Sequence, residues 1–333
     1  MTIKSKYIFN YQFWRIADHF FGNKIPANRF IKQRRKTSAL IHSEFKKRNN
    51  PGKLKQVDIV NNISDNHLYQ NYIKKGIPVV IKGKANNWNA IKKWNPDWLL
   101  KNFPNDKISL FDTSIKENSS PDYEVNNATL KDLIDAMKNG DNSKYSRFNR
   151  ILYDHPELLN DLDWEWLYNM RNTISSGKTF QVFIGGKNTK TTLHSASENN
   201  LFTQVYGKKH WFLYPPEYDV VFNPPITRSP YFHSLFNPDN PDFEKFPNTK
   251  YIQTWECELE AGDILYNPPS WWHHVKNMSD SIGVGFRWFN LNDSIKRSFT
   301  QTLLTIFSKN PPIWYAARNR TNFAKIFKYM NNK

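Results

Sequence analysis

Two stretches decide the fold of this chain: TTLHSASENNLFTQVYGKK at residues 191–209 and GDILYNPPSWWHHV at residues 262–275. In the first, apolar residues on either side of Gly207-Lys208 predict two strands joined by a turn. The second begins at the end of the turn sequence Glu260-Ala261-Gly262 and returns at once to apolar and aromatic residues. Both stretches therefore have the character of short strands, and each contains a histidine.

Further short strands surround these two stretches. Apolar segments at residues 180–186, 255–259, 263–266 and 282–289 lie beside glycine or other turn-forming residues. Short strands at close spacing with turn signals between them are typical of a barrel or a sandwich. We therefore expect a mainly β core between about residues 178 and 292.

The region before this core mixes helix and strand. The run Ile77 to Gly83 is rich in β-branched residues and predicts a strand. Asn95 followed by Pro96 predicts the start of a helix, because asparagine caps helices and proline fits their first turn. We expect an α/β elaboration on the N-terminal side of the core.

Both ends of the chain read as helical. Residues 1–50 are basic and rich in aromatic residues, and they predict two short helices broken near Pro26. Apolar positions from residue 303 to 327 predict C-terminal helices. The expected organisation is a basic helical segment at 1–55, a central domain at 56–292 and a helical segment at 293–333.

Composition describes a folded chain. Aromatic residues make up 16% of its 333 residues, a content that disordered chains lack. Cys257 is the single cysteine, which excludes an intramolecular disulfide and a cysteine-based metal site, and its strand-like surroundings predict a buried structural thiol. The first residues lack the apolar core of a signal peptide and no apolar run reaches a membrane span, so we expect a cytoplasmic location.

The formal net charge of +17 suits an anionic partner. Basic residues are densest at 32–36 and 46–48. This cluster predicts either a patch for polyanions, nucleic acid included, or simply the solvated face of a helix. The charge also favours an anionic small-molecule substrate.

The two stretches, in this order and with strands between them, resemble the cupin-like branch of the JmjC superfamily, close to the asparaginyl hydroxylase that inhibits hypoxia-inducible factor. The segment at residues 237–247 is similar to the insert of that family. The resemblance implies a double-stranded β-helix, also called a cupin or jelly-roll core, with an N-terminal α/β elaboration and C-terminal helices. The position of those helices also implies a homodimer.

That family holds Fe(II) with two histidines and one carboxylate. The resemblance implies His194 and His273 as the two histidine ligands, with His274 as the alternative to His273. The carboxylate position is occupied by Ala196, whose methyl group cannot bind a metal. Glu198 is the nearest acid and the candidate for an alternative, displaced ligand, because it lies on the same face as His194 if the strand continues.

The resemblance also implies a site for the cosubstrate 2-oxoglutarate. Lys209 would pair with its distal carboxylate, Thr191 would hydrogen-bond it and Asn200 would lie near its metal-binding end. Tyr153 is a further candidate. Arg287 stands where the asparaginyl hydroxylase has an asparagine, which departs from that enzyme and predicts an altered pocket or an anionic partner.

Three functions remain open for an iron site without its carboxylate. In the first, chloride or bromide takes the vacated position and the protein is a radical halogenase, since unrelated iron and 2-oxoglutarate halogenases carry alanine or glycine there. In the second, the protein uses Fe(II), 2-oxoglutarate and O2 as a hydroxylase of a protein side chain or a small molecule. In the third, the barrel is an inactive binding module. We take the halogenase as the leading hypothesis.

Overall fold

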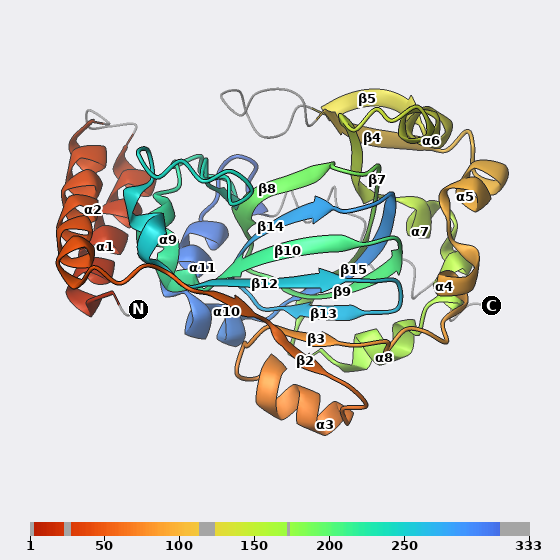
Figure 1. Cartoon of the computed structure of the whole chain (residues 1–333), viewed down its shortest axis with the longest axis horizontal. Helices are drawn as coiled ribbons and strands as arrows, with labels where there is room; N and C mark the ends of the chain where they lie inside the picture. The colour runs from red at the N-terminus through yellow and green to blue at the C-terminus, as the bar shows by residue number, and fades with distance from the viewer. Residues whose placement is uncertain (1–2, 23–27, 113–123, 172–173, 314–333) are drawn as a thin grey trace.

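A computed structural model of the protein describes residues 3–22, 28–112, 124–171 and 174–313. Its centre is a barrel of eight antiparallel strands that alternate largely between two sheets (Figure 1). One sheet contains β12-β10-β14-β8 and the other β13-β9-β15-β7. This arrangement is the double-stranded β-helix, and the predicted fold class is confirmed. The strands are β7 (Ser176–Gly185), β8 (Lys190–Ser195), β9 (Asn199–Tyr206), β10 (Lys209–Tyr214), β12 (Thr254–Leu259), β13 (Ile264–Asn267), β14 (Trp272–Asn277) and β15 (Ser281–Phe289).

Shorter strands extend both sheets. At the edges of the six-stranded sheet, β1 (Leu54–Gln56) pairs with β12 in parallel and β11 (Phe232–His233) pairs with β8. The nine-stranded sheet continues into β3 and β2 on one side and into β6, β4 and β5 on the other. These strands are β2 (Asp58–Val60), β3 (Val79–Ile81), β4 (Lys107–Asp112), β5 (Glu124–Thr129) and β6 (Lys144–Asn149).

The two N-terminal helices pack against each other at one end of the molecule (Figure 1). They are α1 (Ser5–Phe21) and α2 (Asn28–Arg48), of 17 and 21 residues, so the expectation of short helices is wrong. Pro26, the expected break, lies outside the described residues. In α2, every third or fourth residue from Phe30 to Phe45 is buried, which leaves most of the basic cluster on the exposed face.

The remaining helices follow in the chain, and those between β2 and β7 contribute to the apolar cluster on the outer face of the nine-stranded sheet. Among them, α5 begins at Pro96 as predicted, and the Asn95 side chain accepts a hydrogen bond from the Trp98 N–H. The expected C-terminal helices are found at Leu291–Arg297 and Phe299–Ile306, and the apolar positions from 314 to 327 lie outside the described residues. The helices are α3 (Asp65–Leu68), α4 (Asn89–Lys93), α5 (Pro96–Asn102), α6 (Leu130–Lys138), α7 (Ile151–Asp154), α8 (Trp164–Asn169), α9 (Asp219–Phe222), α10 (Leu291–Arg297) and α11 (Phe299–Ile306).

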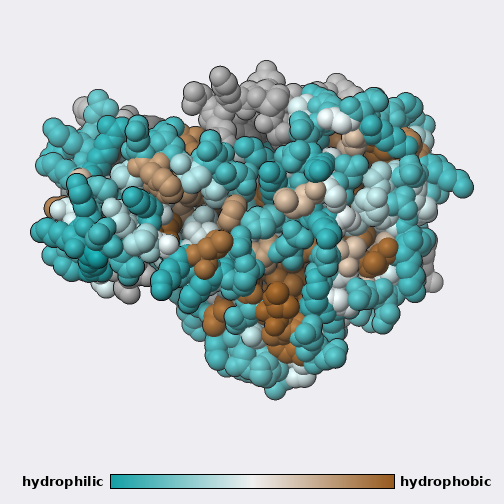
Figure 2. All heavy atoms as spheres, in the orientation of Figure 1, coloured by the Kyte–Doolittle hydropathy of each residue, from teal (hydrophilic) through white to brown (hydrophobic). Residues whose placement is uncertain are grey.

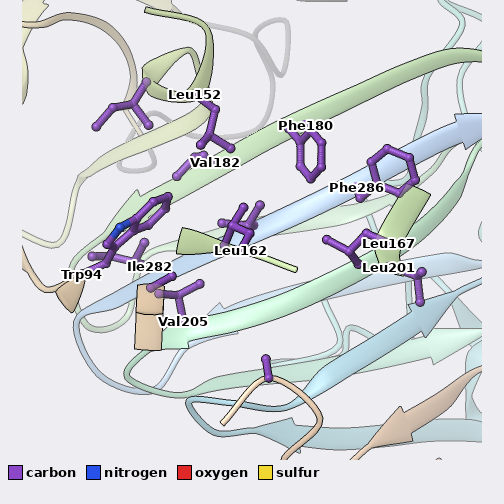
Figure 3. Close-up of a cluster of buried hydrophobic side chains, with 14 of the residues drawn as sticks. Trp94, Leu152, Leu162, Leu167, Phe180, Val182, Leu201, Val205, Ile282 and Phe286 are labelled. Carbon is purple, nitrogen blue, oxygen red and sulfur yellow. The ribbon is translucent and has the colours of Figure 1, made fainter. Parts of the chain in front are cut away.

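Strand β15 has one face in the apolar cluster outside the barrel and the other face towards the barrel interior. Its even-numbered residues, such as Phe286, pack with Phe180 and Leu201 in an apolar cluster under the helices (Figure 3). Its odd-numbered residues face the barrel interior, since neighbouring strand residues point to opposite faces. There, a Cβ on Gly283 would lie 2.3 Å from the Phe202 ring, so only glycine fits.

The visible surface is mostly hydrophilic, with an apolar strip in a hollow near the start of β2 and β3 (Figure 2). Within the described ranges, no helix has the length and apolarity needed to cross a bilayer. Cys257 is buried in β12, as predicted, and burial raises the pKa of its thiol.

A buried carboxylate ties α1 to the barrel. Asp219 is fully buried and accepts hydrogen bonds from four side chains on three elements, α1, β14 and α11. Its Oδ2 lies 2.5 Å from Nη1 of the fully buried Arg15 and 3.1 Å from Gln12 Nε2. Its Oδ1 lies 2.7 Å from both Trp272 Nε1 and Gln301 Nε2. The Arg15 cation and the Asp219 anion therefore compensate each other away from water.

We expect Asp219→Ala to lower the free energy of unfolding by about 3–5 kcal/mol, because it leaves the Arg15 charge buried without its partner. Urea denaturation of the full chain measures this. Asp135→Ala, which breaks an exposed pair with Lys131 one helical turn away, is the control and should cost less than about 1 kcal/mol. Equal effects of the two substitutions would show that the buried pair stabilises the fold no more than the exposed pair does.

Candidate metal and cosubstrate site

The two histidines implied by the sequence stand opposite each other on adjacent strands. His194 on β8 is the direct cross-strand partner of His273 on β14. Their ring centroids are 4.0 Å apart, with the planes tilted by 55°. Trp211 stacks on His273 at 5.6 Å. The structure therefore brings the two predicted histidines together inside the barrel.

Both imidazoles are prepared to bind a metal through Nε2. His194 Nδ1 lies 2.8 Å from the Thr192 carbonyl oxygen, and His273 Nδ1 lies 3.0 Å from that of Trp271. A carbonyl only accepts, so each Nδ1 carries the proton and each Nε2 keeps its lone pair. Burial lowers the pKa of both rings, to about 3 for His273, so both are neutral at physiological pH.

The adjacent histidine faces the other way. His274 Nε2 lies 2.9 Å from Asp239 Oδ2, outside the barrel interior. Neighbouring residues of a regular strand point to opposite faces, which separates His273 from His274. Of the two, His273 is the one that meets His194.

Ala196 lies just past the end of β8 and is buried. Its carbonyl oxygen accepts a hydrogen bond of 2.7 Å from the Ser270 N–H. The strand does not continue to Glu198, which sits in a bend, so the condition for a shared face with His194 is not met. Across the described parts of the chain, no three His, Cys, Asp or Glu side chains are already arranged to hold a metal ion.

Deeper in the barrel, a buried lysine stands among neutral polar groups. Lys209 Nζ is 3.4 Å from the Tyr145 hydroxyl and also donates to Asn277 Oδ1. The Tyr145 hydroxyl in turn hydrogen-bonds Thr191. Burial lowers the pKa of Lys209 to about 7 and raises that of Tyr145 to about 12. An ammonium with hydroxyl donors beside it fits one carboxylate of a small ligand.

A β-bulge in the pairing of β8 with β14 lets the histidine pair and the Thr191 side chain share the interior face of the sheet. His194 pairs with His273, but Thr191 pairs with Val275, so β8 has one more residue than β14 over this interval. The extra residue lets Thr191 and His194, three positions apart, both face the interior. Without it, one of them would point outwards.

A row of polar side chains crosses the opposite wall. Asn200 on β9 is the cross-strand partner of Asn267 on β13 and of Arg287 on β15. All three are buried, and among the described residues neither polar atom of the Asn200 amide has a hydrogen-bond partner. Burial lowers the pKa of Arg287, and the charge of Glu198 opposes that shift. Buried polar atoms without partners indicate a ligand site.

Tyr153, the further candidate for the cosubstrate site, makes its hydrogen bonds to β7. Its hydroxyl bonds Thr179 Oγ1 at 2.9 Å and accepts from the Phe180 N–H at 3.0 Å. The tyrosine beside Lys209 is Tyr145, which comes from the less regular β6. The sequence does not predict Tyr145 and Asn277, because only the closed barrel sets β14 beside β10 and brings the Tyr145 hydroxyl from the opposite sheet to Lys209.

The model of the family described as "Cupin-like domain" matches residues 65–294. The chain belongs to this cupin-like family. Its match spans both histidines, the buried lysine and the polar row, which makes them parts of one family domain.

Relatives place this cupin-like protein in the JmjC superfamily. It is 27% identical to lysine-specific demethylase JMJ30 of Arabidopsis thaliana over 72% of this chain and 56% of that protein. It is 25% identical to JmjC domain-containing protein D of Dictyostelium discoideum, over 66% of this chain and 53% of that protein. It is 22% identical to the human bifunctional peptidase and (3S)-lysyl hydroxylase JMJD7, over 71% of this chain and 84% of that protein.

The chain spans about half the length of the first two of these relatives. The name of JMJ30 describes lysine demethylation, and that of JMJD7 describes lysyl hydroxylation and peptidase activity. The superfamily assignment from the sequence is confirmed. The finer assignment to the asparaginyl hydroxylase branch, and the likeness to halogenases, receive no support from these relatives.

The depressed pKa of Lys209 predicts how stability depends on pH. Between about pH 7 and 10 the unfolded chain binds a proton on this lysine that the folded protein does not, so the free energy of unfolding should rise with pH over that interval. Lys209→Met should remove the rise, as followed by urea denaturation at several pH values. The exposed Lys101→Met is the control and should keep it.

Proposed function

We propose that this cupin-like protein is an Fe(II)- and 2-oxoglutarate-dependent oxygenase that hydroxylates a protein side chain. The observation that carries the proposal is the pairing of two neutral histidines with a buried lysine deeper in the same barrel. A metal on the histidines and a dicarboxylate on the lysine would lie within one interior. The polar row beside them supplies the remaining contacts.

Each residue has a definite task in this reading. His194 and His273 would hold the iron through Nε2. Lys209, with the hydroxyls of Tyr145 and Thr191, would bind the distal carboxylate of 2-oxoglutarate. When bound, iron and 2-oxoglutarate supply the chemistry that activates dioxygen against a substrate C–H bond.

The other interior groups prepare the site. The unpaired amide of Asn200 and the guanidinium of Arg287 can receive the metal-binding end of the cosubstrate. Stacking of Trp211 on His273 keeps that ring in place and excludes water from one side. Arg287 and the protonated form of Lys209 favour an anionic cosubstrate over a neutral one.

Relatives support protein as the substrate class. JMJ30 is named a lysine-specific demethylase and JMJD7 a lysyl hydroxylase, and both names describe chemistry on a lysine side chain. We propose the same class, a side chain presented by a protein. An anionic small molecule is the alternative that the positive charge of the chain favours.

Halogenation is a second candidate because of one observation. Ala196 is buried beside His194 and leaves its ligand position to another donor, and the Arg287 cation in the same interior would attract a halide. Chloride or bromide at the iron would then be transferred to the substrate carbon. No relative described above carries a halogenase name, so hydroxylation is the preferred reading.

An anaerobic titration tests the metal and cosubstrate site. Purified protein with Fe(II) and 2-oxoglutarate should develop a visible metal-to-ligand charge-transfer band, and Lys209→Met should weaken the binding of 2-oxoglutarate at least tenfold because the distal carboxylate loses its cation. We expect chloride to leave the band unchanged. A chloride-dependent shift would support the halogenase, and absence of any band would leave a binding module.

Restoring the carboxylate gives a second test. Ala196→Asp returns an acidic ligand to the position next to the histidines, so a hydroxylase should keep or gain turnover of 2-oxoglutarate to succinate, measured by mass spectrometry. A halogenase should instead lose its halogenated product, because aspartate takes the place of the halide. Ala196→Leu is the matched control, since it fills the space without supplying a ligand.

A further inference from the structure

We propose that His233 is the third protein ligand of the metal and replaces the carboxylate that Ala196 lacks. The inference rests on the proposed iron site of His194 and His273. It concerns a residue outside both sequence stretches that define the site. Its position follows from the order of three strands at one edge of the six-stranded sheet.

Three histidines stand in one row across that edge. The strand order is β14-β8-β11, and His273, His194 and His233 are direct cross-strand partners in turn. Cross-strand partners carry their side chains on the same face of a sheet, with Cβ atoms about 4.5–5.5 Å apart. Since His194 and His273 face the barrel interior, His233 faces it too.

The rings are close enough to act together. The His233 and His194 centroids are 5.9 Å apart with planes 20° from parallel, next to the 4.0 Å between His194 and His273. His233 is stacked on His194, so joining the other two histidines at one metal requires its ring to turn about the side-chain torsions.

The backbone of His233 is held on both sides. The preceding Phe232 is buried beneath the Arg15 guanidinium, 4.7 Å from its ring centroid. The following Ser234 donates from its N–H to the Leu193 carbonyl at 2.9 Å and from its hydroxyl to the Phe222 carbonyl at 3.1 Å. His233 is therefore a half-buried imidazole on a fixed strand, which is a suitable support for a ligand.

Imidazole is a good ligand for iron and other divalent transition metals, and three imidazoles can hold a metal while leaving positions for exogenous ligands. A third histidine would restore three protein ligands and occupy the position that a halide needs. It would also replace an anionic ligand by a neutral one. Because His233 would fill that position, chloride should leave the charge-transfer band unchanged.

Cobalt(II) is the probe for the test, because it binds the same ligands and needs no substrate. X-ray absorption fine structure of the Co(II)-loaded full chain reports coordinated imidazoles through their multiple scattering. We expect His233→Ala to reduce that contribution by one imidazole and to weaken Co(II) binding, measured by calorimetry, at least about tenfold. His233→Gln keeps much of the side-chain volume and should show the same loss.

His210→Ala is the matched control, since His210 lies on β10 beside Glu256 at 3.0 Å and outside the row. This substitution should change neither the imidazole contribution nor the Co(II) affinity. Ala196→Asp should also lower the imidazole contribution by one, with no loss of affinity, because the carboxylate displaces His233. Circular dichroism checks that each variant is folded.

The results separate the two proposals. If His194→Ala and His273→Ala abolish Co(II) binding while His233→Ala and His233→Gln leave spectrum and affinity unchanged, the third-ligand proposal is overturned and the iron site stands. If none of the three positions affects Co(II) binding, the iron site itself is overturned. Loss of one imidazole in both His233 variants supports the proposal.

Discussion

The antiparallel pairing of β8 with β14 is the constraint on which the site depends. It sets His194 opposite His273. The extra residue of β8 in the same pairing turns Thr191 inwards beside Tyr145 and Lys209. A shift of β8 by one residue would send His194 and Thr191 to the outer face of the sheet. One strand pairing thus positions both the two histidines of the proposed metal site and the threonine of the proposed cosubstrate site.

Charge inside the barrel then decides what it can bind. Lys209 and Arg287 are both buried, and burial lowers the pKa of each. Ala196 supplies no carboxylate to offset this positive charge. The interior therefore favours an anionic cosubstrate.

The N-terminal helices take part in the same structure although they precede the matched family domain. Through Arg15 and Asp219, α1 reaches the indole of Trp272, which is next to His273. Through Gln301, Asp219 also connects with the Ser195 hydroxyl, which is next to His194. A buried ion pair is costly to separate, so the helix and the two histidine strands are expected to fold as one unit.

Local sequence alone determined the strands, the turn at Gly207 and the cap at Asn95, because alternation and turn residues are local properties. The roles proposed for His194, His273 and Lys209 came from the resemblance of the two stretches to a known family. Local sequence could not show that β8 ends before Glu198, that Tyr145 rather than Tyr153 lies beside Lys209, or that His233 stands in line with two other histidines. Those facts depend on which distant strands become neighbours. Only closure of the barrel decides that, since strand order and register arise from packing over the whole chain.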